Sequence, residues 1–317
     1  MLHEIFYWVI NMSIIASVVG ILIYFLRFIK GFPQFASYVL WVVVLVRFLC
    51  PLGITSEYSL LNLISNLSEN AIVKSISISE SDIEQKAASK LLPKFSIMNS
   101  IQQADTYDPI TYKTNTMERF IRAAAVVWII VAIAALLTIA VLYYLTVSEL
   151  KKAVPRKGNL YEGGVVNTPT VYGIWKPKII LPTGISEEHL NYILAHEKVH
   201  IRRRDNVWRM LAILAACIHW FNPLSWIFLR CFLRDCEMSC DEAAVKNMNG
   251  EERKKYALTL LAYASEDLTV FSSAFGGSKV KVRIKNVLSY RKLTIFSTVC
   301  FIALVIIIAL LLLTNAA

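Results

Sequence analysis

Four stretches of the chain are long and apolar enough to cross a membrane as helices. They cover residues 5–26, 35–54, 121–145 and 294–314. Each has about 20 mainly apolar residues, which is the length that a helix needs to span the hydrocarbon core of a bilayer. The pattern therefore predicts a multi-pass membrane protein with four transmembrane helices.

A fifth apolar stretch, residues 207–233, is interrupted by polar side chains, among them Arg209, His219 and Asn222. A proline follows Asn222 and breaks the helical pattern. Ionisable groups are costly inside a bilayer. We expect two buried, membrane-proximal helices joined at Asn222-Pro223 and partly sunk in the bilayer, with a full span as the alternative.

The distribution of charge orients these helices. The segment 148–293 carries 23 Lys or Arg against 14 acids, whereas 51–118 carries five Lys against eight acids. Basic segments stay on the cytoplasmic side of a membrane. We expect 148–293 in the cytoplasm, 55–118 outside the cell and both termini outside.

The cytoplasmic segment begins with a short β-element and continues into a helix. Residues 158–182 are β-branched and punctuated by Gly and Pro, which predicts two or three short strands, near 170–174 and 178–181. Ser186 is then a suitable N-cap for a helix from about 187 to 204, with two acids in its first turn.

Composition agrees with a membrane protein. Hydrophobic residues make up 56% of the chain, and the mean hydropathy is +0.53. The net charge of +10 is explained by the cytoplasmic segments, so we expect no direct nucleic-acid partner. The six cysteines avoid the predicted outer loop, which indicates reduced thiols rather than a disulfide framework.

The predicted helix 187–204 contains the sequence His-Glu-Lys-Val-His at residues 196–200. Residues i and i+4 share one helix face, so His196 and His200 can bind one metal ion. Glu197 lies about 100° around the helix from His196 and can act as the general base on a water molecule. This pattern favours a catalytic zinc site with one ion per chain.

The third ligand is less certain from spacing. The other histidines are poorly placed: His3 lies at the N-terminus, His189 lies too far along the same helix, and His219 lies in the apolar stretch 207–233. Glu237 and Asp241 are i and i+4 in a second predicted helix, so Glu237 is a candidate ligand and Asp241 a candidate partner of a ligand histidine. A closed site of both histidines with Cys236 and Cys240 stays open as an alternative.

Three blocks together, AHEKVHIRRRDN, HWFNPLSW and EMSCDEAAV, resemble the M56 family of membrane peptidases, which includes the sensor-transducers BlaR and MecR. The resemblance implies an α-helical integral membrane protein with a cytoplasmic, mainly α, gluzincin-like zinc metalloprotease domain and a small β-element. It implies that His196, His200 and Glu237 bind Zn2+, with Glu197 as the catalytic base and Asp241 supporting a ligand.

The domains expected on this basis follow the hydrophobic pattern. They are two transmembrane helices in 1–54, an extracellular loop at 55–120, a third transmembrane helix at 121–147, the metalloprotease domain at 148–293, and a fourth helix with a short tail at 294–317. The chain stops three residues after the last span, so we expect no penicillin-binding sensor domain.

The resemblance also implies a function in bacterial signalling at the cell membrane. Self-cleavage near Ala274-Phe275, in a small and Gly-rich stretch, and inactivation of a cytoplasmic repressor similar to BlaI or MecI are its expected reactions. A membrane quality-control protease and a non-catalytic, zinc-stabilised transducer are the alternatives. Membrane lipid and a protein substrate are the expected partners, and a homodimer stays open.

Overall fold

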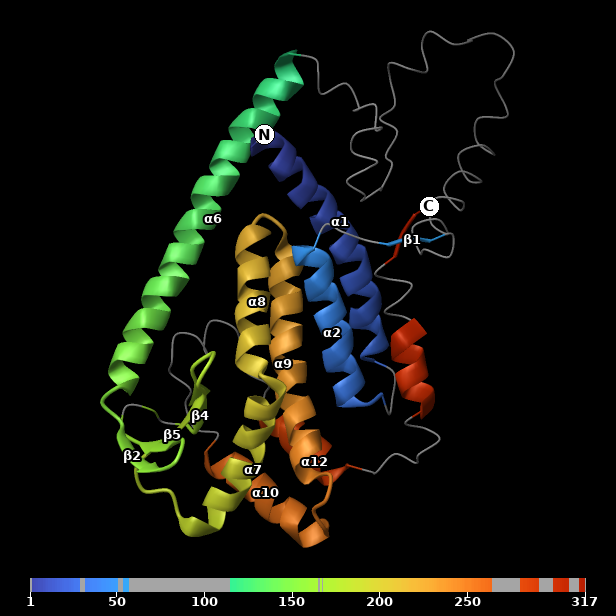
Figure 1. Cartoon of the computed structure of the whole chain (residues 1–317). Coiled ribbons are helices and arrows are strands. Elements are labelled where there is room, and N and C mark those ends of the chain that lie inside the picture. Colours follow the sequence, from blue (N-terminus) through green and yellow to red (C-terminus); the bar gives the residue numbers. More distant parts are fainter. Residues whose placement is uncertain are drawn as a thin grey trace.

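The computed structural model describes residues 2–28, 32–50, 54–56, 115–164, 166, 168–263, 280–290, 299–307 and 314–316. These residues are mostly helical (Figure 1). The helices are α1 (Leu2–Leu26), α2 (Gln34–Leu49), α6 (Asn115–Leu150), α7 (Glu187–Arg203), α8 (Asp205–Ile218), α9 (Pro223–Val245), α10 (Gly250–Ala262) and α12 (Val280–Leu288).

Two of the described helices, α1 and α6, are long and apolar enough to cross a membrane, and α2 is a shorter apolar helix of 16 residues. The fourth predicted span is helical over 299–307, and most of its remainder lies outside the described residues. The predicted outer loop lies almost entirely outside them as well. The four-span topology therefore stays a prediction.

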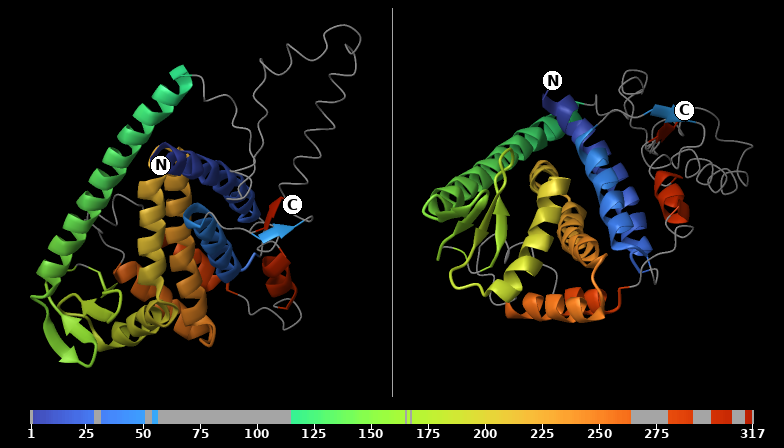
Figure 2. Two further views of the ribbon diagram at one scale, coloured as in Figure 1. Left: turned by 45° about the horizontal axis from the view of Figure 1, so that its top comes forward. Right: turned by 60° about the horizontal axis from the view of Figure 1, so that its bottom comes forward.

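The apolar stretch 207–233 forms a helical hairpin, and its break falls at the predicted place. Helix α8 ends at Ile218 and α9 begins at Pro223, where the Asn222 side chain caps α9 by accepting from Leu224 N at 2.9 Å. The hairpin stands between α6 on one side and α1 and α2 on the other (Figure 2).

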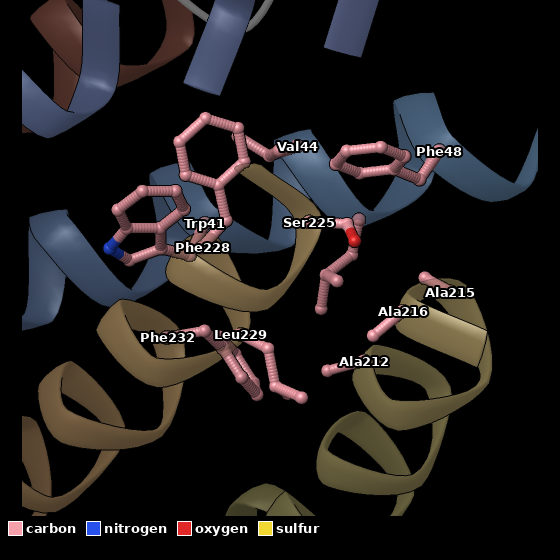
Figure 3. A pocket seen from close by; sticks show the side chains of 11 residues that line it. Trp41, Val44, Phe48, Ala212, Ala215, Ala216, Ser225, Phe228, Leu229 and Phe232 are labelled. Carbon is pink, nitrogen blue, oxygen red and sulfur yellow. The ribbon is translucent and has the colours of Figure 1, made fainter. Parts of the chain in front are cut away.

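The main hydrophobic core joins this hairpin to α1 and α2. Figure 3 shows a small pocket within it, where Trp41, Val44 and Phe48 of α2 face Ala212, Ala215 and Ala216 of α8 and the aromatic face of α9. Small residues on α8 let three helices approach closely, as is common in membrane bundles. Packing therefore fixes α8 and α9 against the apolar helices α1 and α2.

A four-stranded sheet precedes α7. Its strands are β2 (Val154–Lys157), β3 (Leu160–Glu162), β4 (Thr170–Tyr172) and β5 (Lys178–Leu181), in the order β2-β3-β5-β4. Strands β4 and β5 match the prediction, and β2 and β3 add a hairpin that pairs with β5 through β3. A separate pair, β1 (Ile54–Ser56) and β6 (Thr314–Ala316), is parallel.

Helix α7 lies where the sheet meets the base of the α8–α9 hairpin. Ser186 is its N-cap residue, as predicted, and the helix ends where Arg204 adopts a left-handed conformation with φ of 55°. This single residue turns the chain directly into α8. The turn places the C-terminal end of α7 beside the lower half of α9 (Figure 1).

Candidate metal centre

Helices α7 and α9 bring three metal-binding side chains together. His196 and His200 lie one turn apart on α7, and their Nε2 atoms are 3.1 Å apart. Glu237 of α9 faces both, with carboxylate oxygens 3.4 Å from His196 Nε2 and 3.5 Å from His200 Nε2. Both histidines are buried, and Glu237 is largely so.

The donor set fits a zinc ion. Two ligands of a tetrahedral zinc ion at about 2.0–2.1 Å are roughly 3.3 Å apart. Here the two Nε2 atoms are 3.1 Å apart, and each lies 3.4 or 3.5 Å from a different oxygen of the Glu237 carboxylate, Oε2 for His196 and Oε1 for His200. The Nδ1 atom of each histidine has other partners, so both Nε2 atoms face Glu237, and Arg283 Nη2 lies 3.4 Å from His196 Nε2.

The outer nitrogen of His196 is held by residues of α9, α10 and α12. His196 Nδ1 lies 2.9 Å from the Tyr256 hydroxyl and 3.1 Å from Asp241 Oδ1. The Tyr256 hydroxyl donates to Asp241 at 2.7 Å. The Arg283 guanidinium donates to both oxygens of that carboxylate, at 2.7 and 2.8 Å. Burial alone would raise the pKa of Asp241, but Arg283 outweighs it and holds that pKa well below its usual range.

The outer nitrogen of His200 is held by Asp205, the first residue of α8. His200 Nδ1 lies 2.7 Å from Asp205 Oδ2. Burial would raise the pKa of Asp205, but the hydrogen bond and charge of His200, together with the charge of Arg203, lower it to about 2. A carboxylate that stays ionised fixes the His200 ring with its Nε2 toward the metal-binding side chains.

Glu197 lies on the same helix within this buried cluster. Burial raises the pKa of its carboxyl, and the charge of Glu237 adds to that rise, whereas His196 and His200 oppose it. A raised pKa brings a carboxylate closer to the range in which it can accept and return a proton at neutral pH.

Two arginines place positive charge beside Glu237. The guanidinium of Arg209 from α8 pairs with Glu237 Oε1, and Arg283 Nη1 lies 3.4 Å from Glu237 Oε2. Both guanidinium groups therefore orient the third donor toward the histidines. Neither arginine could be assigned to the site from sequence spacing, because Arg209 and Arg283 are 28 and 46 residues from Glu237 in opposite directions along the chain.

The competing ligands have other partners. His189 Nδ1 lies 2.8 Å from Thr259 Oγ1, and His219 Nε2 donates to the Phe48 carbonyl oxygen at 3.0 Å. His219 is therefore a buried, hydrogen-bonded core residue rather than a ligand of this site. Cys240 Sγ lies on the Nδ1 side of His200, at 3.2 Å. That side is opposite the Nε2 atom that faces His196, which disfavours a closed site of two histidines and two cysteines.

The structure thus brings His196, Glu197, His200, Glu237 and Asp241 together, as the sequence predicted. Their chemical roles stay predictions. The expected cleavage position at Ala274-Phe275 lies outside the described residues. Sequence reasoning missed Asp205, Tyr256 and Arg283. An acid directly after three consecutive arginines was the one local signal for Asp205.

Comparison with known proteins agrees with this geometry. The family described as BlaR1 peptidase M56 matches residues 7–287. The methicillin resistance mecR1 protein of Staphylococcus aureus is 28% identical over 135 residues, covering 39% of this chain and 23% of that protein. The regulatory protein BlaR1 of Bacillus licheniformis is 29% identical over 136 residues, covering 40% and 23%.

The matched region is thus less than a quarter of the length of these relatives. The family match is far longer. Its residues 7–287 include most of α1, all of α2 and α6, and the two helices that carry the metal-binding side chains, α7 and α9. Together with the two candidate membrane helices, it indicates a membrane-associated member of a peptidase family. The chain therefore belongs to the BlaR1 peptidase M56 family.

Proposed function

We propose that this protein is a membrane-embedded zinc metalloprotease that hydrolyses peptide bonds in signal transduction. The observation that carries the proposal is the meeting of His196, His200 and Glu237, whose donor atoms lie within 4.8 Å of one another, next to the buried carboxylate of Glu197. Two imidazoles and one carboxylate leave a fourth position of a tetrahedral ion open, as catalytic zinc sites do.

His196, His200 and Glu237 would hold the ion. When bound, zinc supplies Lewis-acid chemistry, because it polarises a carbonyl and makes water more acidic. Glu197 accepts the proton from the attacking water and then delivers it to the leaving amine. Asp241 and Asp205 keep the two imidazole rings oriented during both transfers.

The sheet offers a place for the substrate backbone. Strand β4 is at the edge of the sheet, and Asn206 of α8 donates to the carbonyls of Val171 and Gly173 at 3.2 and 3.0 Å. This contact links β4 to the start of α8, because Asn206 directly follows Asp205 in the chain. An extended substrate segment pairing with β4 would therefore lie close to the metal-binding side chains.

Location and substrate belong to the same proposal. Four spans would place the metalloprotease domain in the cytoplasm and the 55–118 loop outside a bacterial cell. The names of the relatives, a regulatory protein and a methicillin resistance protein, favour a signalling role. Self-cleavage near Ala274-Phe275 and cleavage of a cytoplasmic repressor similar to BlaI or MecI are the proposed reactions.

Glu197→Gln tests the enzyme. The variant keeps all three metal-binding side chains and should retain one zinc ion per chain, but self-cleavage and repressor cleavage should be lost. His196→Ala should lose both metal and cleavage. If Glu197→Gln signals as wild type does although it no longer cleaves, the protein is a non-catalytic transducer, and if it cleaves as wild type does, Glu197 is not the catalytic base. If N-terminal sequencing finds a cut far from Ala274-Phe275, that cleavage site is wrong.

A further inference from the structure

Two buried carboxylates at the base of the α8–α9 hairpin are bound by the membrane helix α2. Asp235 accepts from Ser37 Oγ at 2.6 Å and from Trp41 Nε1 at 2.8 Å. Asp205 accepts from the Tyr38 hydroxyl at 2.9 Å. Both carboxylates are fully buried, so each of these donors replaces a bond that water would otherwise make.

The two oxygens of Asp205 have different partners. Oδ2 lies 2.7 Å from Nδ1 of His200 and 3.3 Å from Cys240 Sγ. Oδ1 faces the other way, toward the Tyr38 hydroxyl at 2.9 Å and Arg203 Nε at 3.3 Å. The carboxylate is therefore a rigid bridge between a metal-binding side chain and a helix that is 167 residues away in sequence.

The Tyr38 ring is itself packed against two side chains, Arg203 and Phe232. The Arg203 guanidinium lies 4.0 Å from the ring centroid, and Phe232 of α9 stacks on the ring at 5.7 Å. Tyr38 is 5% exposed. A ring packed in this way leaves few positions for its hydroxyl. The hydrogen bond from that hydroxyl therefore fixes the position of the Asp205 carboxylate.

The Asp235 contact provides a contrast. Asp235 also pairs with Arg27 at 2.7 Å, where the chain leaves α1. Ser37, Trp41 and Arg27 thus attach the two N-terminal helices to α9. The described contacts of Asp235 are with these three residues and with Arg234, and none of them is a metal-binding side chain.

We propose that Tyr38 of membrane helix α2 is a positioning residue of the metal centre, acting on His200 through Asp205. The inference rests on the proposed function, because it needs His200 to bind a metal ion. It adds that the centre extends into the membrane bundle. A displacement of α2 along its axis would move the Tyr38 hydroxyl, and with it the carboxylate that orients His200.

Three variants of the full-length chain in detergent separate positioning from attachment. Tyr38→Phe keeps the ring between Arg203 and Phe232 and removes only the hydroxyl. Ser37→Ala removes the neighbouring hydroxyl, which binds Asp235. Tyr24→Phe in α1 is the matched control, since its ring packs on Phe25 and Phe28.

The measurement is titration of metal-free protein with Co2+ alone, followed by visible absorption, and with Zn2+ in competition with a chelator. Loss of an outer partner of a metal-bound histidine weakens binding 10–100-fold. Tyr38 is one step further from the ion, so we expect a loss of roughly three- to tenfold and an altered Co2+ absorption band. Ser37→Ala and Tyr24→Phe should leave both unchanged.

The inference is overturned if Tyr38→Phe binds Co2+ with the affinity and spectrum of wild type while wild type binds one ion per chain. It is also overturned if Ser37→Ala changes both to the same extent, because attachment of α2 would then suffice. If wild type binds no ion, or His196→Ala and His200→Ala bind as wild type does, the proposed metal site itself fails.

Discussion

At the scale of single residues, each histidine of the candidate centre is oriented by a different buried carboxylate. Asp241 serves His196 and Asp205 serves His200, at 3.1 and 2.7 Å. The two carboxylates are anchored differently, because Asp241 is held by Arg283 of α12 and Asp205 by Tyr38 of α2. The orientation of the two histidines therefore depends on α2, near the start of the chain, and on α12, more than 230 residues later.

The role of Asp241 can be measured with Asp241→Asn. The change removes the charge that faces Arg283 and weakens the acceptor for His196 Nδ1–H. We expect the zinc affinity to fall roughly 10–100-fold. Chelator competition measures the affinity, and the unfolding temperature of metal-free protein shows how much of the loss comes from the broken Arg283 pair.

Glu242→Gln is the control for this prediction. Glu242 is the next carboxylate on α9, and it accepts from the backbone of Phe35 at 3.0 Å rather than from a histidine. Its variant should bind zinc as wild type does. Equal affinities for Asp241→Asn and Glu242→Gln would show that Asp241 does not support His196.

At the scale of elements, the tip of the α8–α9 hairpin is hydrogen-bonded to the two candidate membrane helices α6 and α1. Trp128 of α6 donates to the Ile218 carbonyl at 2.8 Å, and Asn222 donates to Ser13 and Ser17 of α1 at 2.8 and 2.7 Å. Polar groups in a lipid environment must be satisfied within the protein. These bonds are what a hairpin inserted among membrane helices requires.

The close approach of α1 to α9 gives a test of this packing. A Cβ atom at Gly20 would lie 2.2 Å from the ring of Phe228, so only glycine fits there. Gly20→Val should lower the free energy of unfolding by about 1–3 kcal/mol through overpacking. Thermal unfolding in detergent measures the loss, and the additional change Phe228→Ala should restore part of it, because contacting residues do not act additively.

A matched glycine makes the comparison specific. Gly250, at the start of α10, has no atom within 4 Å of a built Cβ. Gly250→Ala should therefore be close to neutral or slightly stabilising. A Gly20→Val protein as stable as wild type would mean that α1 does not pack against α9 in this way.

Local patterns predicted more of the helices than of the contacts between them. The spacing of His196 and His200, the cap at Ser186 and the break at Pro223 are all set within one or two turns, where side chains four residues apart share a face. Strands β2 and β3 are too short, at four and three residues, to give a period. Pairing of β3 with β5 is also non-local.

The supporting residues of the site are non-local for the same reason. Tyr256 is 60 residues from His196, and Tyr38 is 167 from Asp205. No periodicity connects such positions, so their roles emerge only when the helices are packed. The resemblance to M56 peptidases supplied Glu237, because spacing alone favoured an ordinary acidic helix face at this position.

At the scale of the whole molecule, the candidate centre lies where the bundle of apolar helices meets the polar part of the chain. From this centre, the hairpin of α8 and α9 extends alongside α1, α2 and α6. Helices α7 and α10 and the sheet lie at the base of the hairpin, away from its tip (Figures 1 and 2). If the apolar helices span a membrane as proposed, this arrangement would place the proposed metal site next to its surface, which the charge pattern predicts to be the cytoplasmic one.

Cysteine labelling in intact cells tests that assignment. Thr183 is exposed in the loop before α7, and Ser81 is in the predicted outer loop. Because Cys300 is exposed and the other described cysteines are at least half-buried, Cys300→Ser provides the background. A membrane-impermeant maleimide should label Ser81→Cys but not Thr183→Cys, and lysis should make Thr183→Cys reactive. If Thr183→Cys reacts in intact cells while Ser81→Cys is protected, the orientation is inverted and a cytoplasmic repressor cannot be the substrate.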